Sequence, residues 1–411
     1  MKKKISLLAL TAALVISLTG CFNPAFYNIM QDVPPEEATI FGIVRSVSRY
    51  TVGSEEYLVI NANDGIQYKK ADDNSHGTWK KADIPFSLLK YDYAAKNPDG
   101  TSGVFTGEQI LKVLADSDYL YVVTTTYRNN SVAGRSDPDE VKIWTSKVTD
   151  WDSISWTQIT LPDRESGVEG DTDTRIFQYY EQNDYLTSRF NVFSTNAVEK
   201  AHRAVYVRSG SAKSTIYYSL SNGSISKTSI SSVVGGSADK PVNGVAYLNG
   251  YKFFESSAVC TNEASGTPAT IVYFGKPGDS KLYTYDGSTV TTCLNCGDEL
   301  SCIAVSKDSL IIGRAHYSSL TATSGGAVRV LLNNEGVPAK SLSSFNTNAS
   351  SQLSSAYLIF TLLCVDPSQD EADATFYSSI GFRGTGASTS VTYENVGLWS
   401  YYPERGNWNR E

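Results

Sequence analysis

Short runs of β-branched and aromatic residues, separated by turn residues, recur along the chain from about residue 39 onward. Runs of this kind between Gly, Ser, Asn and Pro clusters are typical of β-strands. No long run has the 3.6-residue period of a helix, and residues 102–114 allow one short helical turn at most. The strand-like runs form pairs: Tyr57–Ile60 with Gly65–Tyr68, Tyr119–Val123 with Val141–Trp144, Ala204–Val207 with Ile216–Leu220, Ile271–Phe274 with Lys281–Tyr285, Leu310–Gly313 with Ala327–Leu331, and Thr375–Ser378 with Gly397–Tyr401. The pattern predicts an all-β protein.

The pairs follow one another at roughly 50 to 75 residues, the signature of a repeated structural unit. A four-stranded unit cannot bury both of its faces alone, and radial stacking of such units leaves only short edges exposed. We therefore predict a β-propeller of six to seven four-stranded blades, with eight as the upper limit. Residues 175–194 would supply the seventh blade, and residues 40–46 a strand that closes the ring with the C-terminal blade. Tandem β-sandwiches are the alternative.

Two copies of a Trp-x5-Pro pattern support the repeat. Trp79–Pro85 and Trp156–Pro162 each place an aliphatic residue directly before the proline. The segment DDNSHGTWKKADIP around Trp79 resembles a degenerate Asp-box of sialidase-like repeats, in which an Asp or Ser turn precedes Gly-x-Thr-Trp. Here Gly77-Thr78-Trp79 is one residue short, and the Trp156 copy lacks the glycine. The Asp-box is a structural turn, so this resemblance implies a propeller blade and no catalytic role.

The N-terminus has the three parts of an export signal. Lys2–Lys4 are cationic, Ile5–Ser17 are apolar and uncharged, and Leu18-Thr19-Gly20-Cys21 follow. A membrane-spanning helix needs about 20 apolar residues, more than this run contains. The tetrapeptide resembles the lipobox of bacterial lipoproteins. That resemblance implies cleavage before Cys21, attachment of a diacylglycerol to its thiol, and a membrane as partner through the N-terminal lipid.

These features divide the chain into three predicted parts: a lipoprotein signal peptide at residues 1–20, a lipidated tether at 21–38 and a β-propeller domain at 39–411. Pro34-Pro35 interrupts regular structure in the tether, and Glu36-Glu37 keeps it solvated. Lipidation predicts a place in the cell envelope. Phe22 stands where many diderm lipoproteins carry the Asp that retains them at the inner membrane, so the sequence favours the outer membrane over the inner. It leaves open whether the protein faces the periplasm or the surface.

Charge and cysteine content limit the classes of partner and the role of the thiols. A net charge of −8 and a pI near 5.1 argue against a nucleic-acid partner. Of six cysteines, five remain after Cys21, and an exported protein permits disulfides. Five is odd, so at least one thiol has no partner within the chain. We predict a structural disulfide among four of these residues in preference to a metal or redox role for the C-x-x-C pair: Cys260, Cys293, Cys296 and Cys302.

Candidate chemistry is sparse. The sequence has no Gly-x-Ser-x-Gly elbow and no arginine in the context that sialidases use. Acidic loops at residues 163–173 and 366–373 lack the spacing of an EF-hand, which favours solvated loops and leaves calcium binding open. No catalytic residue, cofactor or metal site is predicted.

We therefore expect a non-enzymatic, lipid-anchored envelope protein with a binding or scaffold role, in protein–protein interaction, envelope assembly or surface adhesion. Its partner would be a protein or a glycan that the sequence does not identify. The alternative is a carbohydrate-binding or carbohydrate-active propeller. In layout alone, the chain resembles the propeller lipoprotein of the outer-membrane β-barrel assembly machine, and that likeness rests on architecture without a shared motif.

Overall fold

The computed structural model divides into two compact units, Met1–Thr39 and Ile40–Glu411, and the fold below is that of the second. The predicted signal peptide, Cys21 and the predicted tether lie outside the described residues. The described residues are 39–40, 42, 44, 46–75, 77–96, 100, 102–116, 118–130, 135–160, 190–194, 203–209, 214–227, 252–262, 267–275, 280–285, 290–298, 300–314, 326–345, 358–381 and 396–411. No helix in these ranges is long and apolar enough to cross a membrane.

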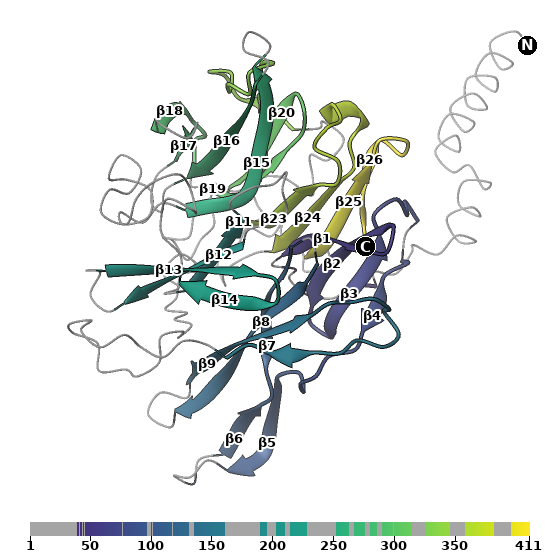
Figure 1. Ribbon diagram of the computed structural model, residues 1–411, viewed down its shortest axis with the longest axis vertical. Coiled ribbons are helices and arrows are strands. Elements are labelled where there is room, and N and C mark those ends of the chain that lie inside the picture. Colours follow the sequence, from purple (N-terminus) through teal and green to yellow (C-terminus); the bar gives the residue numbers. More distant parts are fainter. Residues whose placement is uncertain are drawn as a thin grey trace, which may run out of the picture. The chain divides into compact units, whose positions relative to one another are not determined.

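The described residues form six antiparallel sheets of four strands, and in each sheet the strands are neighbours in sequence order (Figure 1). Blade 1 holds β1 (Val47–Val52), β2 (Glu55–Ala62), β3 (Gly65–Lys70) and β4 (Lys80–Ala82); blade 2 holds β7 (Gln109–Ala115), β8 (Leu120–Asn130), β9 (Arg135–Ser146) and β10 (Thr157–Gln158); blade 3 holds β11 (Phe190–Ser194), β12 (Arg203–Ser209), β13 (Ser214–Ser221) and β14 (Ser224–Lys227); blade 4 holds β15 (Lys252–Asn262), β16 (Thr267–Gly275), β17 (Lys281–Tyr285) and β18 (Val290–Asn295); blade 5 holds β19 (Leu300–Val305), β20 (Ser309–Arg314), β21 (Ala327–Leu331) and β22 (Ser343–Ser344); blade 6 holds β23 (Leu358–Cys364), β24 (Phe376–Gly381), β25 (Gly397–Tyr402) and β26 (Asn407–Arg410).

The first strands of the blades neighbour one another. β1 contacts β7 on one side and β23 on the other, β23 contacts β19, β19 contacts β15, and β15 contacts β11. Between blades 2 and 3, the β13–β14 turn reaches across: the Asn222 amide donates to Asp116 Oδ2 at 3.1 Å and the Gly223 amide to the Tyr121 hydroxyl at 2.9 Å. Each sheet therefore contacts the next, and the last contacts the first. The chain is a β-propeller, as predicted.

The predicted strand pairs are the two middle strands of the six blades. In blade 1, for example, β2 and β3 pair with Val59 opposite Tyr68 and Ile60 opposite Gln67. Local alternation and turn residues were enough to find these strands, because neighbouring strands of a meander need only a short turn between them. The prediction of an all-β fold is confirmed, and six blades account for all the four-stranded sheets of the described residues.

Two finer predictions were wrong, those for residues 175–194 and 40–46. Phe190–Ser194 is the first strand of blade 3, so residues 175–194 are not a blade of their own; residues 175–189 lie outside the described part. Residues 102–114, for which the sequence allowed one short helical turn at most, hold two strands, and the second of these opens blade 2. The described residues of the 40–46 segment belong to no strand, because blade 6 takes all four strands from the C-terminal part of the chain.

The segment at 40–46 nevertheless joins the ends of the propeller. The Ile40 amide donates to the Glu411 carbonyl at 3.2 Å, and the Val44 amide donates to Ser379 Oγ at 2.9 Å. Ile40 and Val44 are fully buried in one apolar cluster that also contains Leu58 of blade 1 and Leu398 of blade 6. Blades 1 and 6 share no sheet, and the 40–46 segment links them by packing and single hydrogen bonds.

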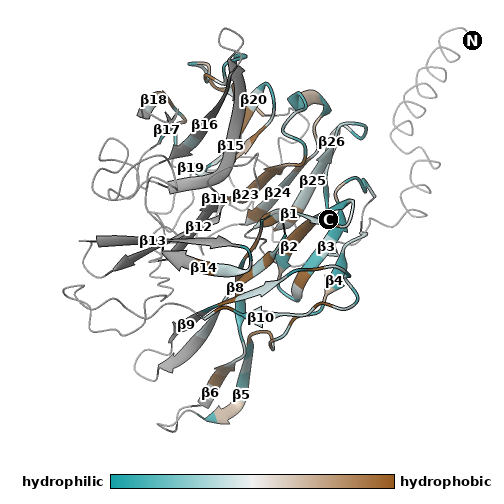
Figure 2. Ribbon diagram, viewed as in Figure 1, coloured by the Kyte–Doolittle hydropathy of each residue, from teal (hydrophilic) through white to brown (hydrophobic). Residues whose placement is uncertain are grey.

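Apolar side chains of the described residues fill the space between blades 1 and 2, between blades 5 and 6, and between blades 6 and 1. One cluster combines β1–β3 residues with those of β7 and β8, and another combines blades 5 and 6. Trp151, in the turn after β9, stacks on Tyr68 of β3 with ring centroids 4.0 Å apart. Figure 2 shows hydrophobic segments on β8 and β23, consistent with this burial. Because blades 1, 2, 5 and 6 bury apolar faces against a neighbouring blade, none of these four needs to be stable alone.

Candidate functional site

A two-stranded hairpin stands apart from the six blades. It is formed by β5 (Lys90–Lys96) and β6 (Ser102–Thr106), in the connection between β4 of blade 1 and β7 of blade 2 (Figure 1). Tyr93 is 82% exposed and Tyr91 is 40% exposed, which makes Tyr93 the most exposed of the large apolar side chains described. Because an exposed aromatic ring gains nothing from the core, this hairpin is the first candidate for a binding element.

Three rings lie together on the hairpin, and we call Tyr91, Tyr93 and Phe105 the aromatic face. Tyr91 pairs with Phe105 across the two strands, with centroids 4.6 Å apart. The Tyr91 and Tyr93 rings meet edge to face, also at 4.6 Å. Gly103 makes room for this arrangement, because a Cβ at its φ of +97° would lie 1.8 Å from the Tyr91 hydroxyl oxygen. The glycine thus lets Tyr91 lie across β6.

The backbone edge of β5 is protected against pairing with another strand. The register shifts between Asp92 and Lys96, and Asp92 Oδ1 accepts hydrogen bonds from the amides of Ala94 at 2.9 Å and Ala95 at 3.2 Å. Lys90 and Lys96 are exposed at the two ends of the strand. Bulges and lysines are the usual devices that prevent edge-to-edge association. Pairing of another strand with the edge of β5 is therefore disfavoured, and the exposed feature of the hairpin is its side chains.

Glu108 fixes the base of the hairpin to blade 2. Its backbone accepts from the Leu89 amide and donates to the Ser87 carbonyl, both at 2.9 Å, which closes the two ends of the hairpin segment. Its carboxylate is nearly buried and accepts hydrogen bonds from three side chains of β8 and β9: Thr124, Lys142 and Trp144. Each carboxylate oxygen is therefore bonded, which compensates for its removal from water. A base held in this way pre-organises the aromatic face.

Acidic residues of the 366–373 loop are used within the fold. Glu371 accepts from Arg329 Nη1 at 3.1 Å and from Ser309 Oγ at 3.1 Å, which ties the loop to blade 5. The Ser368 hydroxyl and the Ser368 amide both donate hydrogen bonds to Asp366 Oδ1. These bonds, of which the hydroxyl bond has the larger effect, hold the pKa of Asp366 below its usual range. The acidic loop at 163–173 lies outside the described residues. Within the described residues, no group of three or more His, Cys, Asp or Glu side chains is arranged to hold a metal ion.

The sequence predicts a disulfide among Cys260, Cys293, Cys296 and Cys302, and Cys293, Cys296 and Cys302 are not bonded to one another. Cys293 lies in β18 at a bulge, opposite no residue of β17. Along an extended strand of about 3.3 Å per residue, Cα atoms three residues apart are about 10 Å from each other, too far for a disulfide. Burial raises the pKa of the Cys296 thiol to about 12. The side chain of Cys260, in β15, lies outside the described part, so pairing through it stays a prediction.

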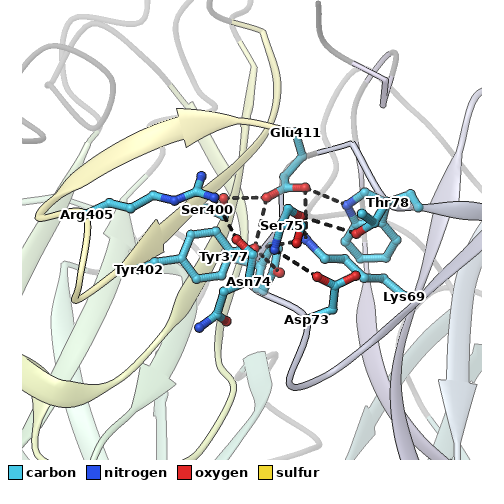
Figure 3. A network of polar contacts seen from close by, with 11 residues as sticks. Lys69, Asp73, Asn74, Ser75, Thr78, Tyr377, Ser400, Tyr402, Arg405 and Glu411 are labelled. Carbon is cyan, nitrogen blue, oxygen red and sulfur yellow. Dashed lines mark hydrogen bonds and ion pairs between the residues drawn. The ribbon is translucent and has the colours of Figure 1, made fainter. Parts of the chain in front are cut away.

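A second polar site joins blades 1 and 6 (Figure 3). Lys69 of β3 and Glu411, which follows β26, form an ion pair with Nζ 3.4 Å from Oε2, and both side chains are fully buried. The ammonium group also donates to the Ser75 carbonyl at 2.6 Å and to the Tyr402 hydroxyl at 3.0 Å. The Glu411 carboxylate accepts from the indole and hydroxyl groups of Trp79, Ser400 and Tyr402. We call these residues the Lys69–Glu411 cluster.

Aromatic rings enclose this cluster. The Lys69 Nζ lies 5.6 to 6.0 Å from the ring centroids of Trp79, Tyr377 and Tyr402, within the range of cation–π attraction. Tyr377 and Tyr402 share a hydrogen bond at 2.7 Å, and burial raises the pKa values of both hydroxyls. Burial is also the main reason that the pKa of Lys69 lies below 10.5. Water is excluded from every charged group in the cluster.

The two Trp-x5-Pro copies occupy equivalent places. Trp79 directly precedes β4 and Trp156 directly precedes β10, the fourth strands of blades 1 and 2. Trp79 is buried and donates to Glu411, whereas the Trp156 indole donates to the Asp83 carbonyl of the preceding blade at 2.8 Å. The turn before Trp79 is held by a side-chain bond, from the Ser75 amide to Asp73 Oδ1 at 2.9 Å. Each copy therefore links two blades.

Sequence reasoning found Trp79 but missed Lys69, Glu108 and Glu411. Single charged residues in a β-protein look like solvated surface positions, and their partners lie 6 to 342 positions away. In the sequence, the aromatic face is indicated only by Tyr91 and Tyr93, which are separated by one residue and so share one face of a strand. That signal was hidden because buried tyrosines follow the same alternation elsewhere.

No protein-family model matches the sequence, and no curated protein matches it. Solved structures with a similar arrangement include the Pyrococcus horikoshii acylaminoacyl peptidase (11% identity, TM-score 0.36, covering 90% of this chain and 52% of the peptidase). The chain thus spans about half the length of that peptidase. A second is a protein of the GH130 family of mannoside phosphorylases, with 11% identity and a TM-score of 0.32, covering 89% of this chain and 86% of that protein. A third is the subtype N10 neuraminidase-like protein of A/little yellow-shouldered bat/Guatemala, with 10% identity and a TM-score of 0.35, covering 85% of this chain and 95% of that protein. These proteins are β-propellers, and likeness at this level says nothing of activity.

Proposed function

We propose that this chain is a lipid-anchored protein of the cell envelope that binds an envelope component through the aromatic face, without catalysing a reaction. The observation that carries the proposal is the hairpin itself. It belongs to no blade, its edge is protected, its base is fixed by Glu108, and it exposes Tyr93 almost completely. Exposed aromatic side chains on a rigid support are typical of binding surfaces, because they offer a large contact area with little loss of side-chain entropy.

The lipid anchor rests on the lipobox-like residues Leu18-Thr19-Gly20-Cys21. A tether from Phe22 to Ala38 spans at most about 60 Å when fully extended. That reach confines the propeller to the neighbourhood of the membrane, which favours a partner within the envelope. Confinement also raises the effective concentration of the binding face near such a partner.

A non-enzymatic role is supported by the contacts of two buried carboxylates, Glu108 and Glu411, and one partly buried carboxylate, Glu371. Glu108, Glu371 and Glu411 are each held by donors of their own chain, in positions that join a hairpin, a loop or two blades. A catalytic acid or base needs its proton to be accessible to a substrate. We therefore assign these three carboxylates to the scaffold.

The test measures binding of the protein to isolated envelopes. A Cys21→Ser variant, which cannot be lipidated, is added to envelope fragments from cells lacking the protein, so that binding depends on the protein surface alone. The double variant Tyr91→Ser, Tyr93→Ser is compared with Leu331→Ser, which removes a 49% exposed apolar side chain from blade 5. We expect saturable binding that falls at least tenfold in the double variant and is unchanged by Leu331→Ser.

Treatment of the envelopes identifies the partner class. Loss of binding after protease digestion indicates a protein, and loss after periodate oxidation indicates a glycan, the carbohydrate-binding alternative raised by the sequence. Absence of saturable binding, or equal binding by the two variants, would refute the role of the aromatic face. Separately, wild-type protein should fractionate with membranes and the Cys21→Ser variant with the soluble fraction; identical fractionation would refute the lipid anchor.

A further inference from the structure

The Lys69–Glu411 cluster places an amine and a carboxyl group next to each other where water cannot reach them (Figure 3). The two residues lie 342 positions apart, on blades 1 and 6. No other contact among the described residues joins these blades through an amine and a carboxyl group that are both fully buried. Ordinary buried ion pairs gain little, because desolvation offsets most of their attraction.

We propose that Lys69 and Glu411 condense to form an isopeptide bond that closes the propeller covalently. The product is an amide between Lys69 Nζ and the side-chain carbonyl carbon of Glu411, and one molecule of water leaves. No electron is transferred, so the reaction needs no oxidant, reductant or cofactor. The bond would take the place of the shared sheet that these two blades lack.

Tyr402 is placed to move the proton that the reaction requires. Lys69 Nζ donates to the Tyr402 hydroxyl at 3.0 Å, and that hydroxyl donates to Glu411 Oε1 at 3.1 Å. Passage of a proton along these two bonds converts the ammonium and carboxylate into a neutral amine and a carboxylic acid. The amine nitrogen then attacks the carboxyl carbon, an N–H proton passes to the leaving hydroxyl, and the C–O bond breaks as water departs.

Other residues of the cluster favour the attack. The Trp79 indole donates to Glu411 Oε2 at 2.8 Å and Ser400 donates to Oε1, so both oxygens are hydrogen-bonded as negative charge develops on them. Burial disfavours the charged form of Lys69 and lowers its pKa, which makes the nucleophilic amine more accessible. Groups held in contact react as though present at effective concentrations that reach about 10⁵–10⁸ M. This gain offsets the unfavourable free energy of amide formation in water.

The experiment is peptide mapping by mass spectrometry of the full-length protein after unfolding and digestion. Cleavage after Trp408 releases a fragment that contains Glu411, and we expect this fragment joined to the peptide that contains Lys69, with the mass of the two less one water. Lys69→Arg serves as the matched control, because the guanidinium keeps the charge and does not condense. Tyr402→Phe keeps both reacting groups and the ring, and should slow formation of the bond at least tenfold after refolding.

The possible outcomes of the peptide mapping can be told apart. The joined peptide as the main product in wild type, with none in Lys69→Arg, supports the bond. Separate recovery of the two peptides from folded wild-type protein, with Lys69 reactive toward an amine reagent after unfolding, overturns it. Equal rates of formation in wild type and Tyr402→Phe overturn the proton relay. None of these measurements depends on the partner of the aromatic face, so the result stands apart from the proposed function.

Discussion

The Lys142 ammonium lies 2.9 Å from the Glu108 carboxylate, and this pair connects the third strand of blade 2 to the base of the β5–β6 hairpin. Glu108 also closes the hairpin through its own backbone. One residue therefore ties the two ends of the hairpin segment to each other and to blade 2.

Replacement of Glu108 by Gln should lower stability by about 1–3 kcal/mol, because the amide removes one acceptor and leaves a buried donor unsatisfied. The matched control is Lys147→Gln, which breaks an ion pair with Asp118 whose side chains are 57% and 47% exposed. Exposed pairs contribute at most about 1 kcal/mol. Urea unfolding midpoints measure both variants. A loss in Glu108→Gln no larger than that in Lys147→Gln would show that Glu108 does not anchor the hairpin.

Gly107→Ala should destabilise the protein more than Gly100→Ala. Both glycines have left-handed φ angles, +86° and +87°, so each alanine incurs about 1–2 kcal/mol of backbone strain. At Gly107 the new Cβ would also lie 2.5 Å from the Leu88 carbonyl oxygen, whereas at Gly100 no atom lies within 4 Å. We expect a further loss of about 1–3 kcal/mol for Gly107→Ala, measured by thermal or urea unfolding. Equal losses would contradict the close approach of the two hairpin ends.

Stability should fall at alkaline pH through Tyr50. Burial raises its pKa to about 12, whereas in the unfolded chain a tyrosine titrates near its ordinary value of about 10. Because the pKa is higher in the folded state, the protonated Tyr50 hydroxyl makes its full contribution to folding stability below about pH 10. That contribution is lost as the pH rises toward about 12. Urea midpoints between pH 8 and 11.5 measure this. Tyr50→Phe, which lacks the proton, should show a shallower decline; a decline of the same slope would assign the effect to other groups.

The buried thiols should be unreactive in the folded protein. Burial raises the pKa values of Cys296 and Cys364 to about 12, so at pH 8 the thiolate fraction is on the order of 10⁻⁴. A disulfide reagent such as DTNB should label both cysteines only after unfolding in urea. Mass spectrometry of labelled peptides locates the sites. Labelling of Cys296 in native protein at the rate seen in urea would show that blade 4 opens at that position.

The strands of the blades were predictable because their signals are local. Val59 and Tyr68 face each other across a turn of a few residues, so alternation within β2 and β3 and the turn residues between them specify the pairing. The repeat of such pairs then required stacked units, since one sheet of this size cannot bury its own apolar faces. The alternation is less clear at residues 102–114, where Gly103 and Gly107 interrupt it.

The contacts that join one blade to the next could not be predicted from local sequence patterns. Residues 40–46 have the composition of a strand, but whether they form one depends on which edge of blade 6 is open. The structure fills that edge with β26, so Ile40 and Val44 contribute packing and single hydrogen bonds instead. Similarly, Phe190–Ser194 has a strand pattern, and only its pairing with β12 assigns it to blade 3.

The sequence by itself determined the all-β class, the six strand pairs and the repeat, because each rests on residues close together in the chain. The tertiary structure alone decided the roles of Glu108, Lys69 and Glu411. A charged residue remains in water unless partners from distant segments surround it and satisfy its hydrogen bonds. The partners of Glu108 come together when β8 and β9 pair in blade 2, and those of Lys69 and Glu411 come together when blade 6 meets blade 1. Neither the hairpin anchor nor the Lys69–Glu411 cluster therefore has a signature in the linear sequence.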